Sequence, residues 1–382
     1  MNAMELLDII NAGENSRVEL KQDTIDQESL LQEIVSFANT EGGNIIFGIQ
    51  DRTYKIIGLT REQQDDIDNK IANISNDLIR PFLQIITDTI LIEDKLLLII
   101  SIPKGSNKPY NTKGHIYTRQ GSTKRLLTDK DEILRFYQSS GSLYADEMIV
   151  ESTSIKDVDL SKIKNYIATF KKGISNIDEQ LLINLGVLKD ERLTLGGLLF
   201  FGKDPQAYKP NFLIKAVSFF GNSIGGKDYR ESLNIQGTIP ELFDAGVYFF
   251  NKNLRHTQQG QNFNSLGIME ISQIVIEEIL QNALVHRDYL RNSPIRLFIF
   301  DNRIEIISPG KLPNGLTVEN IKLGNAVARN NLLVSYCSKA MSYSGLGSGI
   351  TRSLEEQPNI EFINDIDGEQ FIVKIPRQGD DR

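Results

Sequence analysis

The chain has 382 residues, 40% of them hydrophobic and 24% charged, which is the balance of an ordinary soluble protein with two or three domains. The single cysteine, Cys337, and three histidines far apart in the sequence exclude a disulfide scaffold and a zinc site built from cysteines. The net charge of −8 argues against indiscriminate binding of polyanions, although it leaves room for a local basic groove.

The N-terminal residues contain neither a basic segment nor a long apolar run, so we expect no signal peptide. The most apolar stretch, residues 89–102, is interrupted by Glu93, Asp94 and Lys95 and cannot span a membrane. We therefore expect a cytoplasmic protein with no membrane partner.

The first part of the chain predicts a compact α+β domain over residues 1–136. Leu30, Ile34 and Ala38 follow helical spacing, and a glycine-containing turn separates them from a short apolar strand. In chain order, the predicted elements are two helices around an extended segment in residues 5–40, a strand at 44–49 with a partner strand at 56–59, a helix over 61–80 and a hairpin over 84–102.

The second part predicts a further mixed domain after a polar, serine-rich linker at residues 137–160. We divide it into a lead-in α/β segment, 161–265, and a C-terminal domain, 266–382. The predicted helices are 161–171, 239–254, 271–291 and one near 350–356, and the predicted strands are 211–221, 295–301, 304–308 and 371–375. The fold class is therefore α+β.

Glu278 and Asn282 lie four residues apart in the predicted helix 271–291, so they share one helical face. A carboxylate beside a bound nucleotide can deprotonate a water molecule, and an amide oxygen suits Mg²⁺. Taken alone, the pair also fits polar residues on the solvent side of a helix. Two strands follow, and Gly345, Gly347 and Gly349 stand just before another helix, where backbone amides could approach phosphates.

Residues 271–356 resemble the divergent ATP-binding domain of the GHKL superfamily, which includes gyrase and the histidine kinases. NALVHRDY, at residues 282–289, and LTLGGLLFFGKDPQ, at 193–206, are similar to segments of one branch of that superfamily. The resemblance implies an α/β sandwich that binds ATP and Mg²⁺, with Glu278 as the general base and Asn282 as the magnesium ligand. It further implies adenine contacts from Ser308 and Gly310, a mobile region at Arg329 and Asn330, and a phosphate cradle at Gly345, Gly347 and Gly349.

Ser308 stands where most members of the superfamily carry an aspartate that binds the adenine amino group. A neutral hydroxyl is a weaker partner for that group, so a retained fold with a degenerate pocket is the alternative. His286 fits either a phosphate contact or a structural role at the helix end.

Acidic residues cluster near the N-terminus, where GENSRVELK places Glu14, Glu19 and Lys21 close together and Asp51 follows the strand 44–49. Alternate residues of a strand share a face, so Glu19 and Lys21 would point the same way. Converging carboxylates bind divalent metals in nucleases, but scattered surface acids give the same pattern.

The segment 104–125 carries six basic residues and no acidic residue, with Tyr110 and Tyr117 interleaved. Basic loops with aromatic residues suit a nucleic-acid backbone, and a solvated loop is the equal alternative. The candidate contacts are Lys104, Lys108, Lys113, Arg119, Lys124 and Arg125.

SFANTEGGNIIFGIQD, at residues 36–51, closely resembles the hallmark of Schlafen AlbA-like domains, and GENSRVELK and Tyr117-x-Arg119-x-Gly121-Ser122 fit the same family. The resemblance implies a nucleic-acid-binding domain. Animal Schlafens use a related carboxylate triad to cut transfer RNA, so Glu14, Glu19 and Asp51 are the candidate metal-binding and catalytic triad, with Lys21 in support.

Together the two resemblances predict an ATP-binding, nucleic-acid-binding regulator in which the nucleotide state of the C-terminal domain controls the N-terminal domain. We expect DNA rather than RNA as the partner, and a homo-oligomer by analogy with both families. The alternative is an ATP-gated, metal-dependent nuclease, for instance a defence effector. A third hypothesis is a scaffold with two degenerate domains.

Overall fold

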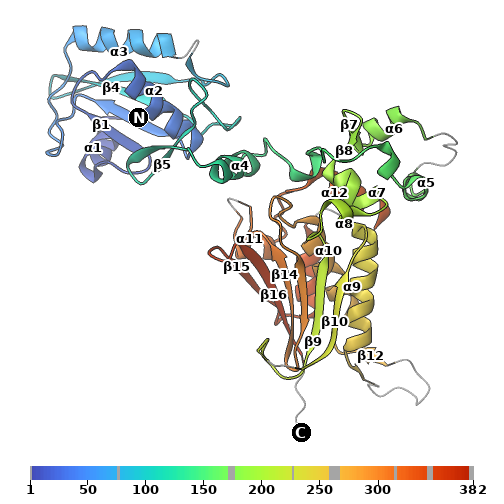
Figure 1. Cartoon of the computed structure of the whole chain (residues 1–382). Coiled ribbons are helices and arrows are strands. Elements are labelled where there is room, and N and C mark those ends of the chain that lie inside the picture. Colours follow the sequence, from blue (N-terminus) through green and yellow to red (C-terminus); the bar gives the residue numbers. More distant parts are fainter. Residues whose placement is uncertain are drawn as a thin grey trace. The chain divides into compact units, whose positions relative to one another are not determined.

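The computed structural model describes residues 2–74, 78–170, 177–225, 228–257, 267–313, 316–341 and 347–377. The chain forms two compact units, Met1–Leu143 and Tyr144–Arg382, each with its own helices and sheet (Figure 1). Its mixture of helices and sheets is the predicted α+β class.

The N-terminal unit is built on a four-stranded sheet in the order β1-β2-β4-β3. β1 and β2 are parallel and are joined by α2, while the other neighbours are antiparallel. A small hairpin, β5 and β6, packs on α2. The elements are α1 (Ala3–Ala12), β1 (Val18–Lys21), α2 (Gln27–Asn39), β2 (Gly43–Phe47), α3 (Arg61–Asn73), β3 (Ile86–Ile92), β4 (Lys95–Ile102), β5 (Tyr117–Gln120), β6 (Thr123–Leu126) and α4 (Lys130–Ser139).

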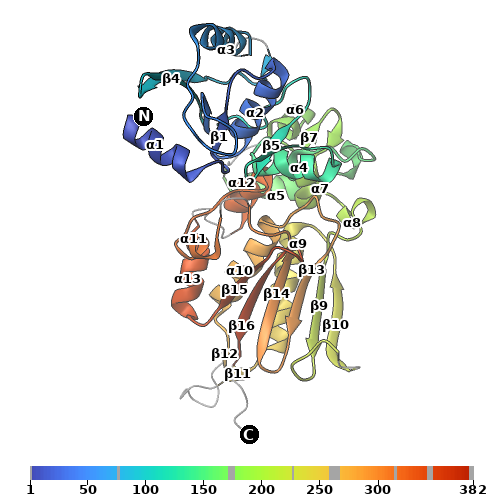
Figure 2. The ribbon, with the colours of Figure 1, turned by 90° about the vertical axis from the view of Figure 1, so that its left-hand side faces the viewer.

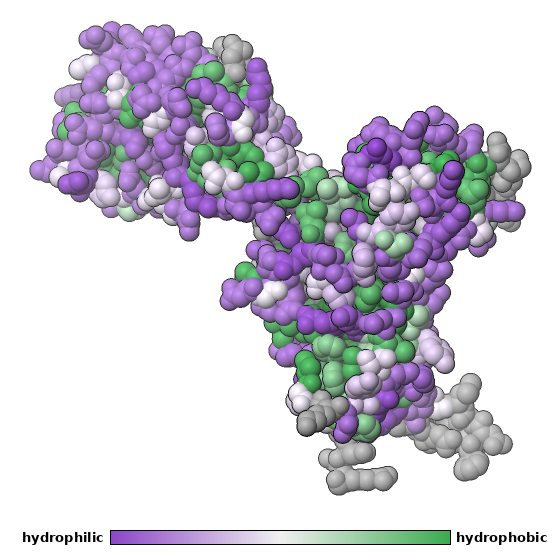
Figure 3. All heavy atoms as spheres, in the orientation of Figure 1, coloured by the Kyte–Doolittle hydropathy of each residue, from purple (hydrophilic) through white to green (hydrophobic). Residues whose placement is uncertain are grey.

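Apolar residues alternate along the strands and fill a core on each face of this sheet. Ile45 and Phe47 face α2 and α3, whereas Ile46 faces α1. Hydrophilic side chains cover most of the unit's surface in the view of Figure 3. Residues 56–59 do not form the predicted partner strand. Single bridges join Ile56 to Ile49 and Leu59 to Leu96, and β2 pairs instead with β1 and β4.

The C-terminal unit contains a six-stranded sheet in the order β10-β9-β13-β14-β16-β15 (Figure 2). β9 and β13 are parallel and the other pairs are antiparallel. Two short antiparallel pairs, β7 with β8 and β11 with β12, lie outside this sheet. The strands of the unit are β7 (Leu188–Lys189), β8 (Arg192–Leu193), β9 (Ile214–Phe219), β10 (Tyr229–Ile235), β11 (His256–Thr257), β12 (Ile268–Met269), β13 (Ile295–Ile299), β14 (Arg303–Pro309), β15 (Glu361–Asp365) and β16 (Gln370–Pro376).

Helices α9, α10 and α13 lie on one face of this sheet and bury the main core of the unit against it. On the other face, Phe219, Phe298 and Phe300 pack together in a smaller aromatic cluster. The helices of the unit are α5 (Leu160–Ala168), α6 (Glu179–Asn184), α7 (Leu195–Phe201), α8 (Pro205–Tyr208), α9 (Ile239–Asn253), α10 (Gln273–Val285), α11 (Val318–Lys322), α12 (Asn331–Ala340) and α13 (Ser348–Glu356), with short 3₁₀ turns at Ala145–Glu147 and Ile155–Asp157.

Most of the segment expected to be a linker, residues 144–160, belongs to the C-terminal unit. Ala145, Val150 and Val158 are buried in the core of that unit. The amide of Val150 donates to Leu193, and that of Asp159 to Phe201. The serine-rich composition of residues 137–160 concealed these few apolar positions, which are spaced too widely to give a periodic pattern.

Candidate functional site: a pocket beside α10 and a charged network beside α2

Helix α10 presents Glu278 and Asn282 to a pocket in the C-terminal unit. Glycines at the start of α13 and residues that follow β14 also line this pocket, and apolar side chains form much of its wall. Of the residues predicted for nucleotide binding, those that line the pocket are Glu278, Asn282, Ser308, Gly310, Arg329, Gly347 and Gly349. Segments far apart in the sequence therefore meet in one concave site.

Two glycines let the start of α13 approach α10 and the loop after α11. A Cβ atom on Gly349 would lie 2.1 Å from Oε2 of Glu278, and one on Gly347 would lie 2.0 Å from the Gly324 carbonyl oxygen. Gly347 also has a φ of +76°, the left-handed region that disfavours other residues. Side chains at these positions would collide with Glu278 and with the Gly324 backbone, so glycine permits this close approach. Gly345 lies outside the described residues.

Glu278 is largely buried and pairs with Arg352 on α13. Burial raises the pKa of Glu278 above its usual value, and the Arg352 guanidinium opposes that rise. A carboxylate of this kind can accept a proton from a bound water.

Polar groups at the other end of the pocket are held by backbone atoms. The Ser308 hydroxyl donates to the Ala283 carbonyl at 3.0 Å, which leaves its oxygen able to accept a hydrogen bond. The Arg329 guanidinium donates to the Lys311 carbonyl at 2.6 Å. His286 also lines the pocket, and burial, with the Arg329 charge, lowers its pKa to about 4. His286 is therefore neutral at pH 7.

Asn330 is buried beside the pocket rather than in its lining. Its Nδ2 donates at 2.8 Å to the carbonyls of Val285 and Arg287, at the end of α10. The side chain therefore ties the loop before α12 to the helix that carries Glu278 and Asn282.

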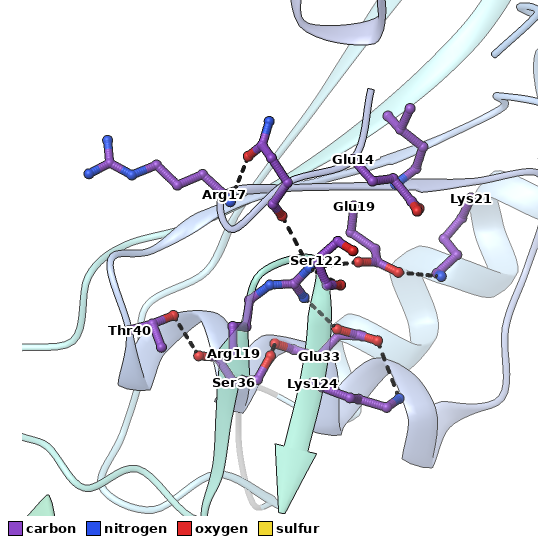
Figure 4. A network of polar contacts seen from close by, with 12 residues as sticks. Glu14, Arg17, Glu19, Lys21, Glu33, Ser36, Thr40, Arg119, Ser122 and Lys124 are labelled. Atoms are coloured by element: carbon purple, nitrogen blue, oxygen red, sulfur yellow. Dashed lines mark hydrogen bonds and ion pairs between the residues drawn. The ribbon is translucent and has the colours of Figure 1, made fainter. Parts of the chain in front are cut away.

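In the N-terminal unit, Arg119 lies between two glutamates that come from different elements. Its guanidinium bonds Glu19 of β1 and Glu33 of α2, each at 2.8 Å (Figure 4). It also stacks over the ring of Phe37. Glu19 also accepts from Lys21 at 2.6 Å. The Arg119 side chain is 1% exposed, so this network is an internal one.

The predicted triad of Glu14, Glu19 and Asp51 does not come together as three metal ligands. Glu14 accepts the Leu20 amide at 3.2 Å, and Asp51 lies in an exposed turn. Among the described residues, no three His, Cys, Asp or Glu side chains form a group that could hold a metal ion. The partner that Glu19 does share is Arg119, which also binds Glu33, a residue that the sequence analysis did not single out.

The six predicted basic contacts lie in different places. Arg119 is buried, Lys124 pairs with Glu33 at 3.3 Å, and Lys113 pairs with Glu28 at 3.4 Å near the start of α2. Arg125 pairs with Glu132 of α4.

Lys104 and Lys108 instead lie near the end of α2, together with Arg17. Lys104 bonds the Glu41 carboxylate at 2.9 Å, and the Arg17 guanidinium lies 3.7 Å from the same carboxylate. Lys108 donates to the Thr40 carbonyl. The hydrogen bond from Lys104 and these neighbouring charges lower the pKa of Glu41. We call Arg17, Lys104, Lys108 and Glu41 the Glu41 patch. Three cations surround one carboxylate there, and Arg17 points away from the Arg119 network (Figure 4).

Residues 14–128 match the family described as Schlafen, AlbA_2, and residues 292–374 match the family described as Putative ATP-dependent DNA helicase recG C-terminal. Residues 134–215 match a domain of unknown function, DUF8451. The two matches are those of a fused protein, AlbA-like in its N-terminal part and ATPase-like in its C-terminal part. The two predicted resemblances are confirmed.

Among solved structures, the DIP2311 protein from Corynebacterium diphtheriae is 20% identical, with a TM-score of 0.50 over 98% of this chain and 80% of that one, a likeness of fold. The N-terminal domain of the putative ATP-dependent DNA helicase RecG-related protein from Nitrosomonas europaea is 23% identical over 34% of this chain and 96% of that one, with a TM-score of 0.26. No curated protein matches the chain. No helix among the described residues is long and apolar enough to cross a membrane.

Proposed function

We propose that the protein is an ATP-binding, nucleic-acid-binding regulator. The observation that carries the proposal is the pocket of the C-terminal unit in which Glu278, Asn282, Gly347 and Gly349 meet. The match of residues 292–374 to an ATP-dependent helicase family favours the same function.

The pocket fits a nucleotide with Mg²⁺ in its donor set and in its shape. The Asn282 amide oxygen would hold the metal, which would neutralise charge on the phosphates. The Gly347 and Gly349 backbone would cradle the phosphates, because both glycines line the pocket at the N-terminal end of α13. Ser308 would accept from the adenine amino group, and Glu278 would accept a proton from water.

The N-terminal unit would bind the nucleic-acid backbone through the Glu41 patch. Lys104 and Arg17 are more than half exposed and lie on one surface. Phosphate groups would displace Glu41 as their partner, with release of counterions. Arg119 and Lys124 would act within the fold, because both are tied to Glu33. We propose DNA as the partner, because the family that residues 292–374 match is described as a putative ATP-dependent DNA helicase.

Regulation requires that ATP bind more tightly to one conformation than to another. Pocket-lining segments before α12 and at the start of α13 are the parts that nucleotide would order. We propose that this change alters the grip of the N-terminal unit on DNA, within a homo-oligomer in the cytoplasm.

Isothermal titration of ATP with Mg²⁺ into the full chain tests the nucleotide site. We expect saturable binding in the wild type, at least tenfold weaker binding in Asn282→Ala, and unchanged binding in Asn184→Ala, a control on the exposed helix α6. Failure of the wild type to bind at millimolar ATP would contradict the proposal and favour a degenerate pocket at Ser308.

The nuclease alternative has less support, since Arg119 and Lys21 already occupy both oxygens of Glu19. If the wild type cleaves DNA or RNA in the presence of Mn²⁺ and Glu19→Gln does not, the nuclease alternative would be favoured. Unchanged binding without cleavage would favour the regulator.

A further inference from the structure

The two carboxylate oxygens of Glu278 face different neighbours. Oε1 accepts from Nη2 of Arg352. Oε2 lies on the side of Gly349, at the start of α13. One oxygen is therefore held by a cation, and the other is directed to the end of the pocket where the phosphates would lie.

Arg352 approaches Glu278 from outside the nucleotide pocket. It lines a second hollow between α9, α10 and α13, and it does not belong to the lining of the first. Glu278 lines both, so its carboxylate forms the wall between them. Glu277, Glu355 and Glu356 surround the second hollow, where their negative charge favours a cation such as Arg352.

We infer that Arg352 is a positioning residue for Glu278 in ATP hydrolysis, an inference that rests on the proposed function. In that step the oxygen of water bonds to the γ-phosphorus, the bond from phosphorus to the bridging oxygen breaks, and ADP leaves with the electron pair. Oε2 of Glu278 takes the proton of the attacking water. Arg352 holds Oε1 in place and thereby orients Oε2 toward the attacking water.

Helix α13 links this function to nucleotide binding. Gly349 lies in its first turn and Arg352 comes three residues later, so both lie on the same face of the helix. A shift of α13 on binding phosphates would move Arg352 with it, and the orientation of the Glu278 carboxylate would then change as well. The residue that orients the base is thus part of the element that holds the phosphates.

The test compares Arg352→Gln and Arg352→Lys with Arg192→Gln, which breaks a matched, exposed pair with Glu151. ATP affinity comes from calorimetry and kcat from phosphate release. We expect Arg352→Gln to lower kcat about tenfold while the Kd for ATP stays within about twofold. Arg352→Lys retains the charge and should recover most of the lost rate, and the control should keep both constants.

Three outcomes would overturn the inference: unchanged or faster hydrolysis by Arg352→Gln, a loss explained wholly by Kd, or ATP binding without hydrolysis by the wild type. The proposed ATP site survives each of these. Absence of ATP binding by the wild type would instead overturn the proposed function itself. If Arg352→Gln does not fold, Arg352→Met, which keeps an apolar stem on α13, replaces it in the same comparison.

Discussion

The two units each contain a buried glutamate that binds an arginine, yet the arrangements differ. The side chains of Glu19 and Glu278 are 8% and 10% exposed. The partner of Glu19, Arg119, is 1% exposed and also binds Glu33, whereas the partner of Glu278, Arg352, is 47% exposed. Burial of a carboxylate therefore does not by itself indicate chemistry.

What distinguishes the two sites is what the remaining oxygen can reach. Both oxygens of Glu19 are taken, by Arg119 and Lys21. Oε2 of Glu278 faces a pocket lined by glycines. We therefore propose that the Glu19 site stabilises its unit and that the Glu278 site is the one that carries out chemistry.

The largest effect should come from Arg119→Met, which leaves Glu19 and Glu33 buried without their shared cation. We expect a loss of about 3–5 kcal/mol in the free energy of unfolding. Denaturant unfolding measures it, with Arg125→Met as the exposed control. A loss below about 1 kcal/mol would mean that the network does not stabilise the unit and that Glu19 is available for another function.

Another buried carboxylate, Asp146, accepts the Leu333 amide at 3.0 Å, and burial raises its pKa to about 7. Because the folded pKa exceeds the unfolded value of about 4, the folded state binds the proton more tightly, and stability falls as pH rises from 4 through 7. Asp146→Asn imitates the protonated form. It should gain about 4 kcal/mol relative to wild type at pH 8 and little at pH 4, as thermal melting in the two buffers would show. Equal gains at both pH values would contradict the raised pKa.

Gly349→Ala tests the pocket directly, because the added Cβ would lie 2.1 Å from Glu278. We expect ATP affinity to fall at least about tenfold, or 1.4 kcal/mol, with the unit still folded. The control is Gly225→Ala, where a Cβ meets nothing within 4 Å. If Gly349→Ala still bound ATP with wild-type affinity, the result would mean that the phosphates do not bind beside Gly349.

The smallest effects concern the Glu41 patch. Lys104→Gln and Arg17→Gln should each weaken DNA binding about threefold and lower the slope of log affinity against log salt by about one. Lys113→Gln, an equally exposed lysine paired with Glu28, should have no effect. Fluorescence anisotropy over a salt series measures both quantities. If only Lys113→Gln lost affinity for DNA, the result would indicate that DNA binds near the start of α2 and not at the Glu41 patch.

Much of the fold was predictable where apolar periodicity is strong, as in α2, α10 and the β3–β4 hairpin. The edge strands β10 and β15 were missed, because polar residues such as Asn234 and Glu361 interrupt their patterns. The partner assigned to β2 was wrong, since the sequence suggested a local hairpin and the true partner β4 follows some fifty residues later. Long-range pairing leaves no local signal.

For the sites, the family resemblance pointed to most of the residues that line the C-terminal pocket, although Asn330 lies beside the pocket and Gly345 lies outside the described residues. Glu33 and Arg352 belong to no motif. The available signals were weak: Glu33 occupies a buried position on the apolar face with Leu30 and Phe37, and Arg352 follows Gly349 by one helical turn. Only the three-dimensional structure shows which charges meet.

The central claim is that nucleotide in the C-terminal unit alters DNA binding by the N-terminal unit. The most direct measurement is the Kd for labelled duplex DNA, with and without saturating ATP and Mg²⁺, in the wild type and in Asn282→Ala. The account predicts a change of at least about fivefold in the wild type and none in the variant. Equal DNA affinities with and without ATP, in a wild type shown to bind ATP, would contradict it.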